Sequence, residues 1–530
     1  MIWVDRIAQK LTTAQHIDDM FTPSGYAHIG SLRGPILHDV VYRVLREQTD
    51  DTVFTYVFND FDVIDGLSDD LKKTHEKYMG YVLRMAPSPV EGYESFAQFY
   101  TEEMKRILND LGVNAEYLSS WDMYHEGKFN DTIKIALDNR DKILEIYRRI
   151  GGYAKKSDDW YPLQVICPSC HKLGTTHVTG WDGTKVKFTC EKNLVTWAEG
   201  CGYTGTVSPF DGNGKFPWKV DWPAHWKNLG ITLEGAGKDH ASRGGSYDIA
   251  FEIVDKVFNY EKPFYFPYEF FMLGGKKMSS SKGIGASSKD IHSILPPEIF
   301  RFLIIRTPVE RTIEFDPHGD TILNLFDEYD KCLSAYYDKL EGILPEGKQG
   351  EVLSDFARIA ELSQVRQHSE KRLFVPRFRT VVNMIRNKSD LLGTFEQQKG
   401  APLTGEEKEI LEERSVYAQS YLKNIVGSET SYELIDSIPE SFTPSDDQKL
   451  FLAELAEQLA GCASDDREEL TNVIFSSMKK HNLAPRNVFK ALYLILIGQE
   501  GGPKAADLIL EFGVQKAIER IQKVLLGNSI

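Results

Sequence analysis

The sequence predicts an α/β protein, in which a doubly wound parallel sheet carries a cysteine-rich insertion and is followed by an all-helical C-terminal region. Three observations predict this fold class. Strand-like and helix-like segments alternate through the first half of the chain, as they do around parallel sheets. Four of the six cysteines cluster between residues 167 and 201. From residue 296 onward, amphipathic helices alternate with polar turns.

The parallel sheet is expected within residues 1–286. Four segments have a strand-like composition, the first only weakly: residues 17–21, 52–58, 231–234 and 264–272. Pro267 predicts that the last segment is an edge strand or is broken. Helical periodicity is found in residues 32–46, 93–111 and 133–150. Ligands of such sheets bind at the carboxyl ends of the strands, so a site is expected there.

Two further regions, residues 287–345 and 346–530, are expected after the sheet domain. Their helices are predicted over residues 300–306, 322–340, 447–459 and 504–526, with a break at residues 342–350. Residues 155–215 are rich in Gly, Thr, Cys and aromatic residues and interrupt the α/β pattern. They are therefore predicted to form an insertion in the first domain.

The net charge of −16 argues against indiscriminate nucleic-acid binding, although a local basic patch can still hold phosphates. Residues 366–388 contain seven lysines and arginines against one acid, Glu370, and form either a solvated helix face or such a patch. No apolar run approaches the ~20 residues that span a bilayer, and the N-terminus lacks a signal peptide's apolar stretch. We therefore expect a cytoplasmic protein without a membrane partner.

Two glycine-containing loops point to phosphate chemistry. Residues 22–31 (TPSGYAHIGS) place His28 just before an amphipathic run, where the N–H groups of a helix N-terminus can hold an anion. Residues 274–283 (GGKKMSSSKG) add three lysines and three serines to a flexible backbone. Each loop alone is also compatible with an ordinary glycine turn. Together they can hold a polyphosphate from two sides.

The ordered pair of loops resembles the HIGH and KMSKS signatures of class I aminoacyl-tRNA synthetases, and in detail the chain resembles class I lysyl-tRNA synthetases. Ser31 stands where the first signature ends in His, and Ser280 where the second has its inner Lys. The resemblance implies a Rossmann-like nucleotide-binding domain, lysine, ATP and tRNA as substrates, and Mg²⁺ and Zn²⁺ as metals.

The resemblance also implies the site residues. His28, Lys277 and Lys282 would stabilise charge on the phosphates of ATP, with Lys282 supplying the second charge in place of the inner Lys. The ATP-binding residues would be Ser24, Gly25, His28, Gly30, Gly237, Lys276, Lys277, Met278 and Ser279. Trp222, His240 and Tyr268 would lie near the bound lysine, because aromatic faces suit an ammonium group. Without the resemblance, Trp222 and Tyr268 are expected to be core aromatics.

The clustered cysteines predict a metal site. Cys167 and Cys170 form a C-x-x-C knuckle, and Cys190 and Cys201 can complete a tetrahedral zinc site. The wider spacing of the second pair makes the match to a zinc ribbon partial, and His171 or His177 could replace one sulfur. Structural zinc is favoured over unligated thiols, because the insertion has no obvious core of its own.

The resemblance assigns a tRNA contact to each region. The zinc insertion would sit near the acceptor end, residues 287–345 would contact the stem at the inner bend of the tRNA, and residues 346–530 would meet the anticodon. Three alternatives stay open: a class I synthetase for another amino acid, a small-molecule adenylyltransferase of the same fold, and a non-catalytic zinc-containing RNA-binding protein. The sequence implies no particular oligomeric state.

Overall fold

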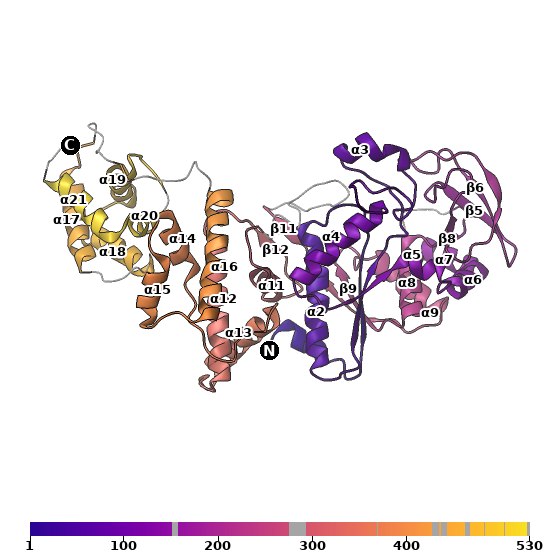
Figure 1. The fold of residues 1–530 in the computed structure, drawn as a ribbon, viewed down its shortest axis with the longest axis horizontal. Helices are drawn as coiled ribbons and strands as arrows, with labels where there is room; N and C mark the ends of the chain where they lie inside the picture. Colours follow the sequence, from indigo (N-terminus) through magenta and orange to yellow (C-terminus); the bar gives the residue numbers. More distant parts are fainter. Residues whose placement is uncertain are drawn as a thin grey trace. The chain divides into compact units, whose positions relative to one another are not determined.

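The computed structural model describes residues 1–150, 157–274, 293–367, 369–426, 434–435, 442–461, 467–481, 483–502 and 504–526. Its contacts divide the chain into two units, Met1–Arg377 and Phe378–Ile530 (Figure 1). The predicted boundary at residue 346 falls inside the first unit, because α13 (Lys348–Ser363) packs against α11 (Pro297–Ile305) and α12 (Thr321–Leu340). The tRNA contacts expected of residues 287–345 and 346–530 stay predictions.

The first unit is built on a five-stranded parallel sheet, which confirms the predicted fold class. Its strands are β1 (His16–Phe21), β2 (Val53–Phe58), β3 (Glu116–Ser119), β9 (Leu233–Gly237) and β10 (Phe264–Tyr268). Their order across the sheet is β10-β9-β1-β2-β3. The chain thus winds outward from β1 to β3 and later returns on the other side of β1. The winding direction reverses between β1 and β9, and ligands of such sheets bind at this point, at the carboxyl ends of the strands.

The composition matches the position in the sheet for β10 but not for β1. β1 is the central strand although two of its six residues are aspartates, Asp18 and Asp19, both of them buried. β10 contains Pro267 and is an edge strand, as predicted. The predicted strand over residues 264–272 is broken after Tyr268, and its end forms β11 (Phe271–Leu273), which pairs with β12 (Ile313–Phe315).

Helices of the first unit cover the sheet and extend beyond it. α2 (Arg33–Arg46) follows the short turn η1 (Ile29–Leu32) and packs on β1, β2 and β9, because its apolar side chains face the sheet. The predicted helix over residues 133–150 is two helices separated at Asn139. The other helices are α1 (Trp3–Ala8), α3 (Asp69–His75), η2 (Glu76–Tyr78), α4 (Phe96–Asp110), α5 (Ser120–His125), α6 (Asn130–Asp138), α7 (Arg140–Ile150), α8 (Trp218–Leu229) and α9 (Ser246–Lys256).

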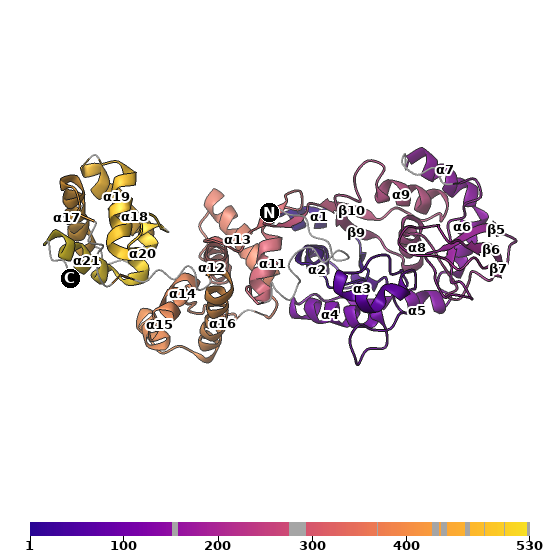
Figure 2. The same cartoon turned by 90° about the horizontal axis from the view of Figure 1, so that it is seen from above.

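The insertion between α7 and α8 is a small antiparallel β structure. Its strands are β4 (Gln164–Val165), β5 (Thr176–Trp181), β6 (Val186–Cys190), β7 (Thr204–Val207) and β8 (Gly214–Lys215). β5, β6 and β7 form one sheet, and β4 pairs with β8. The strands lie beside α6 and α7 (Figures 1 and 2), and Val178 and Phe188 share a buried cluster with Ile143 and Ile249. The insertion therefore shares the core of the sheet domain.

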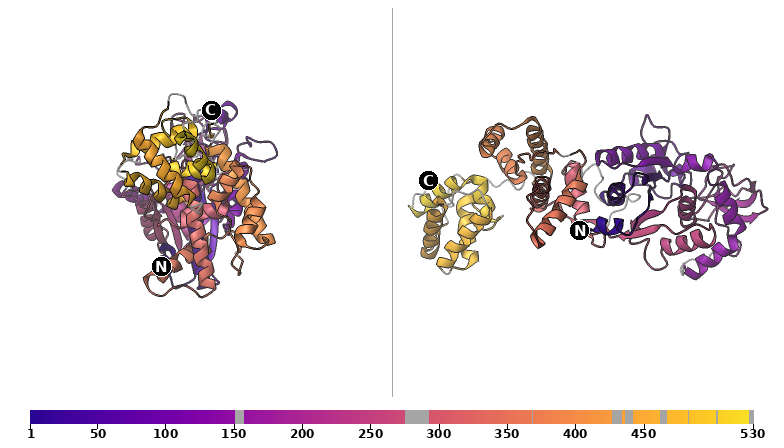
Figure 3. Two further views of the ribbon diagram at one scale, coloured as in Figure 1. Left: turned by 90° about the vertical axis from the view of Figure 1, so that its left-hand side faces the viewer. Right: turned by 90° about the horizontal axis from the view of Figure 1, so that it is seen from below.

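The second unit is helical throughout its described residues. Its elements are α14 (Phe378–Arg386), α15 (Leu391–Lys399), α16 (Gly405–Tyr421), the π-helical turn η3 (Leu422–Val426), α17 (Asp446–Ala460), α18 (Arg467–Lys480), α19 (Pro485–Ile497), α20 (Ala505–Phe512) and α21 (Val514–Leu525). The helices from α17 onward lie together, coloured gold to yellow in Figure 3. Their buried apolar side chains form one cluster. Gly513, with φ +91°, breaks the predicted helix over residues 504–526 into α20 and α21. In the described part of the chain, no helix is long and apolar enough to cross a membrane.

Candidate functional site

A pocket of about 290 Å³ opens at the carboxyl ends of β1, β9 and β10, where the winding of the sheet reverses. The structure brings five of the predicted site residues together in its lining: His28, Gly30, Gly237, His240 and Tyr268. They come from segments more than 200 residues apart in the sequence. The strand order therefore assembles the two predicted binding segments into one cavity.

His28 is the residue of the first loop with a defined proton position. The backbone N–H of Ser31 donates to its Nδ1 over 3.1 Å, so Nδ1 carries no proton and Nε2 carries it. His28 is the N-cap of η1, and both His28 and Ser31 line the pocket. Ser31, which replaces the final His of the signature, thus fixes the imidazole orientation through its backbone. Ser24 and Gly25 lie in the turn before η1, outside the pocket lining.

Trp222 lies behind the pocket. It is buried on α8, and its indole N–H donates to Glu234 Oε1 over 2.8 Å. The ring contacts the His240 imidazole edge to face, with the ring centroids 5.6 Å apart. Trp222 therefore supports His240, which lines the pocket, and is absent from the lining itself.

Glu234 is a buried acid on β9 that receives two indole N–H groups, one from Trp222 and one from Trp226. Burial raises the pKa of Glu234 to about 8, against the lowering effect of these hydrogen bonds. The tryptophans of α8 thus hold a carboxyl group that is largely protonated at neutral pH beneath the pocket.

Arg33 was not predicted and lines the pocket at the start of α2. Its terminal nitrogens donate to the backbone carbonyls of Glu269, Phe270 and Arg311 at 2.6, 3.1 and 3.0 Å. Burial lowers its pKa to about 10, so the guanidinium stays charged at neutral pH. Arg33 therefore connects the start of α2, which follows the first loop, to the chain segments that lead into β11 and β12.

The second signature loop lies outside the described residues, and with it Lys276, Lys277, Met278, Ser279 and Lys282. The chain that leads into it is described. Phe271 of β11 lines the pocket, and the Gly274 N–H donates to the Phe315 carbonyl over 3.1 Å. β11 therefore carries the chain from the pocket wall to the start of this loop.

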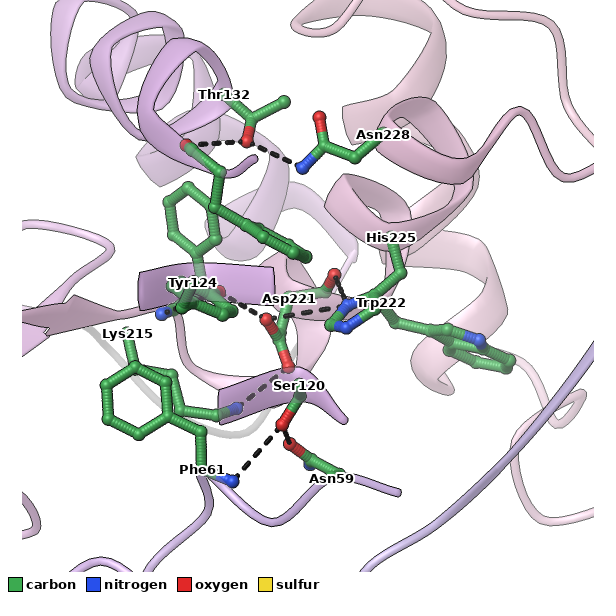
Figure 4. Close-up of polar contacts among 12 residues, drawn as sticks. Asn59, Phe61, Ser120, Tyr124, Thr132, Lys215, Asp221, Trp222, His225 and Asn228 are labelled. Carbon is green, nitrogen blue, oxygen red and sulfur yellow. Dashed lines mark hydrogen bonds and ion pairs between the residues drawn. The ribbon is translucent and has the colours of Figure 1, made fainter. Parts of the chain in front are cut away.

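A buried polar network joins α8 to β8 of the insertion and to α5 (Figure 4). Lys215 Nζ lies 2.8 Å from Asp221 Oδ2, and the Tyr124 hydroxyl donates to Asp221 Oδ1 over 2.5 Å. All three side chains are almost fully buried. Figure 4 shows Asp221 pointing toward Lys215 and Tyr124, whereas the indole of Trp222 points away from them. Two consecutive residues of α8 thus have different partners. Asp221 binds Lys215 of β8, and Trp222 donates to Glu234 of β9.

Cys167, Cys170, Cys190 and Cys201 come together as predicted, with their four sulfur atoms all within 4.8 Å of one another. The backbone N–H of Cys201 donates to Cys190 Sγ over 3.3 Å, as amides do in thiolate metal sites. Neither histidine considered as a replacement belongs to this cluster of described residues, and His177 Nδ1 instead lies 2.7 Å from Glu191 Oε1. The donor set therefore fits a tetrahedral thiolate zinc site.

Part of the basic stretch over residues 366–388 is engaged within its own unit. Arg372 is paired with Asp338 and Glu341 of α12. Arg377 is paired with Asp327 of the same helix at 2.9 Å. These two arginines are paired with acids of α12, so fewer of the seven basic side chains are available to a phosphate than the sequence alone indicates.

Comparisons with known proteins cover the whole chain. A family model described as "tRNA synthetases class I (K)" matches residues 1–366, and one described as "Anticodon binding domain" matches residues 424–525. The Lysine–tRNA ligase of Methanosarcina barkeri is 32% identical over 543 residues, covering 98% of this chain and 97% of that protein. The Lysine–tRNA ligase of Picrophilus torridus is 30% identical over 531 residues, covering 99% of each.

A solved structure also aligns along the chain. A glutamate tRNA ligase from Elizabethkingia meningosepticum overlaps with a TM-score of 0.37 at 12% identity, covering 97% of this chain and 99% of that chain.

Proposed function

The chain belongs to the family of class I (K) tRNA synthetases, and from that premise we propose that it is a lysine–tRNA ligase. It activates lysine with ATP to lysyl-adenylate and transfers the lysine to the 3′-terminal ribose of its tRNA. The observation that carries the proposal is that one pocket at the β1–β9 reversal joins His28 and Gly30 to Gly237, His240 and Tyr268.

Adenylation requires no covalent nucleophile. The site aligns the lysine carboxylate with the α-phosphate of ATP and stabilises the charge that grows on the phosphate oxygens. His28 donates its Nε2 proton to such an oxygen, since Ser31 occupies Nδ1. Ser24, Gly25 and Gly30 shape the backbone of this loop.

The lysines of the second loop are proposed to act on the leaving group. Lys276, Lys277 and Lys282 neutralise the β- and γ-phosphates as pyrophosphate departs, and Met278 and Ser279 complete that binding segment. Ser280 stands at the position of the signature's inner Lys, and Lys282 is proposed to supply that positive charge instead. Magnesium ions arrive with ATP and screen the same phosphate charge.

The four clustered thiols are proposed to hold a structural zinc ion. When bound, it cross-links the loops of the insertion, which sit on the sheet domain through a shared core. The insertion is proposed to face the tRNA acceptor end, the region over residues 287–345 the tRNA stem, and the helical region, which matches an anticodon-binding model, the anticodon. A small-molecule adenylyltransferase needs no such region. The cytoplasmic location stays a prediction.

Pyrophosphate exchange into ATP tests the proposed function. The full chain with lysine, Mg²⁺ and tRNA is expected to exchange pyrophosphate, and lysine is the only amino acid that supports the exchange. Exchange with a small acid other than an amino acid, without need of tRNA, would indicate an adenylyltransferase. Binding of tRNA without any exchange would indicate a non-catalytic RNA-binding protein.

A further inference from the structure

Asp19 is a buried acid in the pocket lining. One of its carboxylate oxygens accepts no hydrogen bond from the described residues and can accept one from a ligand. Asp19 lines the pocket and is 8% exposed. Its Oδ1 accepts the backbone N–H of Met20 over 2.8 Å, whereas Oδ2 is buried and accepts no hydrogen bond among the described residues. A buried carboxylate oxygen without a donor is costly, and a ligand that brings a donor removes this cost.

Among the described residues, no lysine or arginine is paired with Asp19. The nearest titratable nitrogen is His38 Nδ1, 3.4 Å from Oδ2. That nitrogen donates to the Gly34 carbonyl over 2.8 Å, and Nε2 accepts the Gly235 N–H over 2.7 Å. A backbone amide can only donate, so Nε2 accepts and carries no proton in this geometry. Burial lowers the pKa of His38, but the negative charge of Asp19 outweighs this effect and raises it. No lysine or arginine lies within 4.0 Å of Asp19 among the described residues, and Arg33 is held by backbone carbonyls.

Gly34 leaves the space that this carboxylate and Tyr268 occupy. A Cβ atom on Gly34 would lie 2.6 Å from the Tyr268 hydroxyl and 3.0 Å from Asp19 Oδ2. Gly34 stands in the first turn of α2, where a helix gains from alanine, so its presence has a steric reason. Two oxygens, one from a carboxylate and one from a phenol, thus converge over one glycine.

Acids outnumber the one arginine in the pocket lining, which holds Asp19, Asp239 and Glu269 against Arg33. Asp239 also lines the pocket, and Glu269 is paired with Lys238. The aromatic ring of Tyr56 closes the lining beside Asp19 and is 1% exposed. A carboxylate with aromatic neighbours is a site for an ammonium group.

We propose that Asp19 Oδ2 binds the ε-ammonium of the lysine substrate, with the Tyr268 hydroxyl beside it, and that Gly34 leaves the room for both. This assignment rests on the proposed function and makes Asp19 the specificity-determining residue. The α-ammonium and carboxylate of the substrate then face the more exposed end of the pocket, toward His28 and His240.

The test compares lysine with norleucine, which keeps the α-ammonium but has no ε-ammonium. In aminoacylation by the full chain, with tRNA and ATP saturating, Asp19→Asn is expected to raise KM for lysine about 10²-fold. The inhibition constant of norleucine is expected to stay unchanged. Gly34→Ala is expected to raise KM for lysine in the same way and to remain folded, because alanine favours the helix.

Asp18→Asn is the matched control. Asp18 is the adjacent buried acid on β1, lies outside the pocket lining, and accepts the Thr55 hydroxyl over 2.6 Å. Burial raises the pKa of Asp18, and asparagine keeps the size of the side chain and an oxygen that can accept the Thr55 hydroxyl. KM for lysine is expected to stay unchanged in it.

Three results would overturn the assignment. An unchanged KM for lysine in Asp19→Asn and Gly34→Ala would exclude Asp19. An equal loss for lysine and norleucine would place the α-ammonium at Asp19, and an equal loss in Asp18→Asn would mean a general effect on β1. A separate outcome is that the wild-type chain attaches no lysine to tRNA. That result would contradict the proposed function rather than the role of Asp19.

Discussion

The proton on His28 Nε2 is a consequence of one backbone hydrogen bond. Ser31 N–H occupies Nδ1, so the imidazole can only present an N–H on its other side. A neutral donor of this kind can follow the negative charge that develops on a phosphate oxygen during adenylation. In His28, Nδ1 therefore takes part in the structure of the loop, and Nε2 is left to donate to the substrate.

His28→Asn is expected to keep the N-cap of η1, because asparagine is a good N-cap, and to lose the ring donor. The rate of lysine-dependent pyrophosphate exchange is expected to fall about 10²–10³-fold. KM for lysine is expected to change little. Rapid-quench measurement of adenylate formation checks this, and an unchanged rate would remove His28 from the adenylation step.

The free energy of unfolding is expected to depend on pH, because the pKa of Glu234 differs between the folded and the unfolded chain. This pKa is raised from 4.5 to about 8 in the folded chain, so the folded state binds the proton more tightly than the unfolded state. The resulting stability is present in full below pH 4.5 and is lost as the pH rises toward 8, by up to about 1.4 kcal/mol per pH unit. Asp18, whose pKa is also raised, adds to the same trend.

Glu234→Gln is expected to flatten the fall in the free energy of unfolding between pH 5 and pH 8. Urea denaturation at several pH values measures this. Glu252→Gln is the control, because ion pairing with Lys256 and Arg149 lowers the pKa of Glu252 and it does not titrate in this range. A slope as steep in Glu234→Gln as in the wild type would show that Glu234 is ionised in the folded chain.

Helix α8 connects the insertion to the layer behind the pocket. Asp221 binds Lys215 of β8 and the Tyr124 hydroxyl, whereas Trp222 and Trp226 hold Glu234 of β9. A buried ion pair contributes little net stability over apolar replacements, but an unpaired buried charge is strongly unfavourable. The Lys215–Asp221 pair is therefore one polar contact between the insertion and α8, beside the apolar core that they share.

Asp221→Asn is expected to cost about 3–5 kcal/mol of unfolding free energy, because the buried Lys215 loses its counter-charge. The double variant Asp221→Asn/Lys215→Met is expected to be more stable than Asp221→Asn alone. Denaturation of the wild type, both single variants and the double variant gives the coupling energy. Strictly additive losses would mean that the two residues do not act as a pair.

The cysteine cluster is the proposed zinc site of the insertion. Cys170→Ser is expected to abolish stoichiometric zinc binding and to make the chain between β4 and β8 sensitive to proteases. Metal analysis of the purified chain checks the first effect. Cys332→Ala, in α12 and outside the cluster, is expected to retain zinc. Retention of zinc by Cys170→Ser would contradict the four-thiol site.

The sequence predicted the elements whose composition serves packing alone. β2 and α12 were found from their apolar patterns, whereas β3, with the polar sequence EYLS, was missed. The break at Asn139 was missed because the helical period continues across it. His28 and Gly30 were found from a motif. Asp19, Arg33 and Tyr56 were not, because they meet only through a strand order that periodicity does not specify.

The whole chain combines a pocket in its first unit with a helical second unit. The two family models cover most of both, and the Lysine–tRNA ligases that resemble the chain do so along nearly its full length. A net charge of −16 leaves tRNA binding to local surfaces, and the pairing of Arg372 and Arg377 with α12 removes two charges from one of them.

Aminoacylation of total tRNA, with each of the standard amino acids in turn, tests whether the two units together act as a lysine–tRNA ligase. Lysine alone is expected to be attached, and only to the tRNAs that read lysine codons. Attachment of a different amino acid would contradict the assigned specificity, and absence of any attachment with lysine, ATP, Mg²⁺ and tRNA present would contradict the ligase itself.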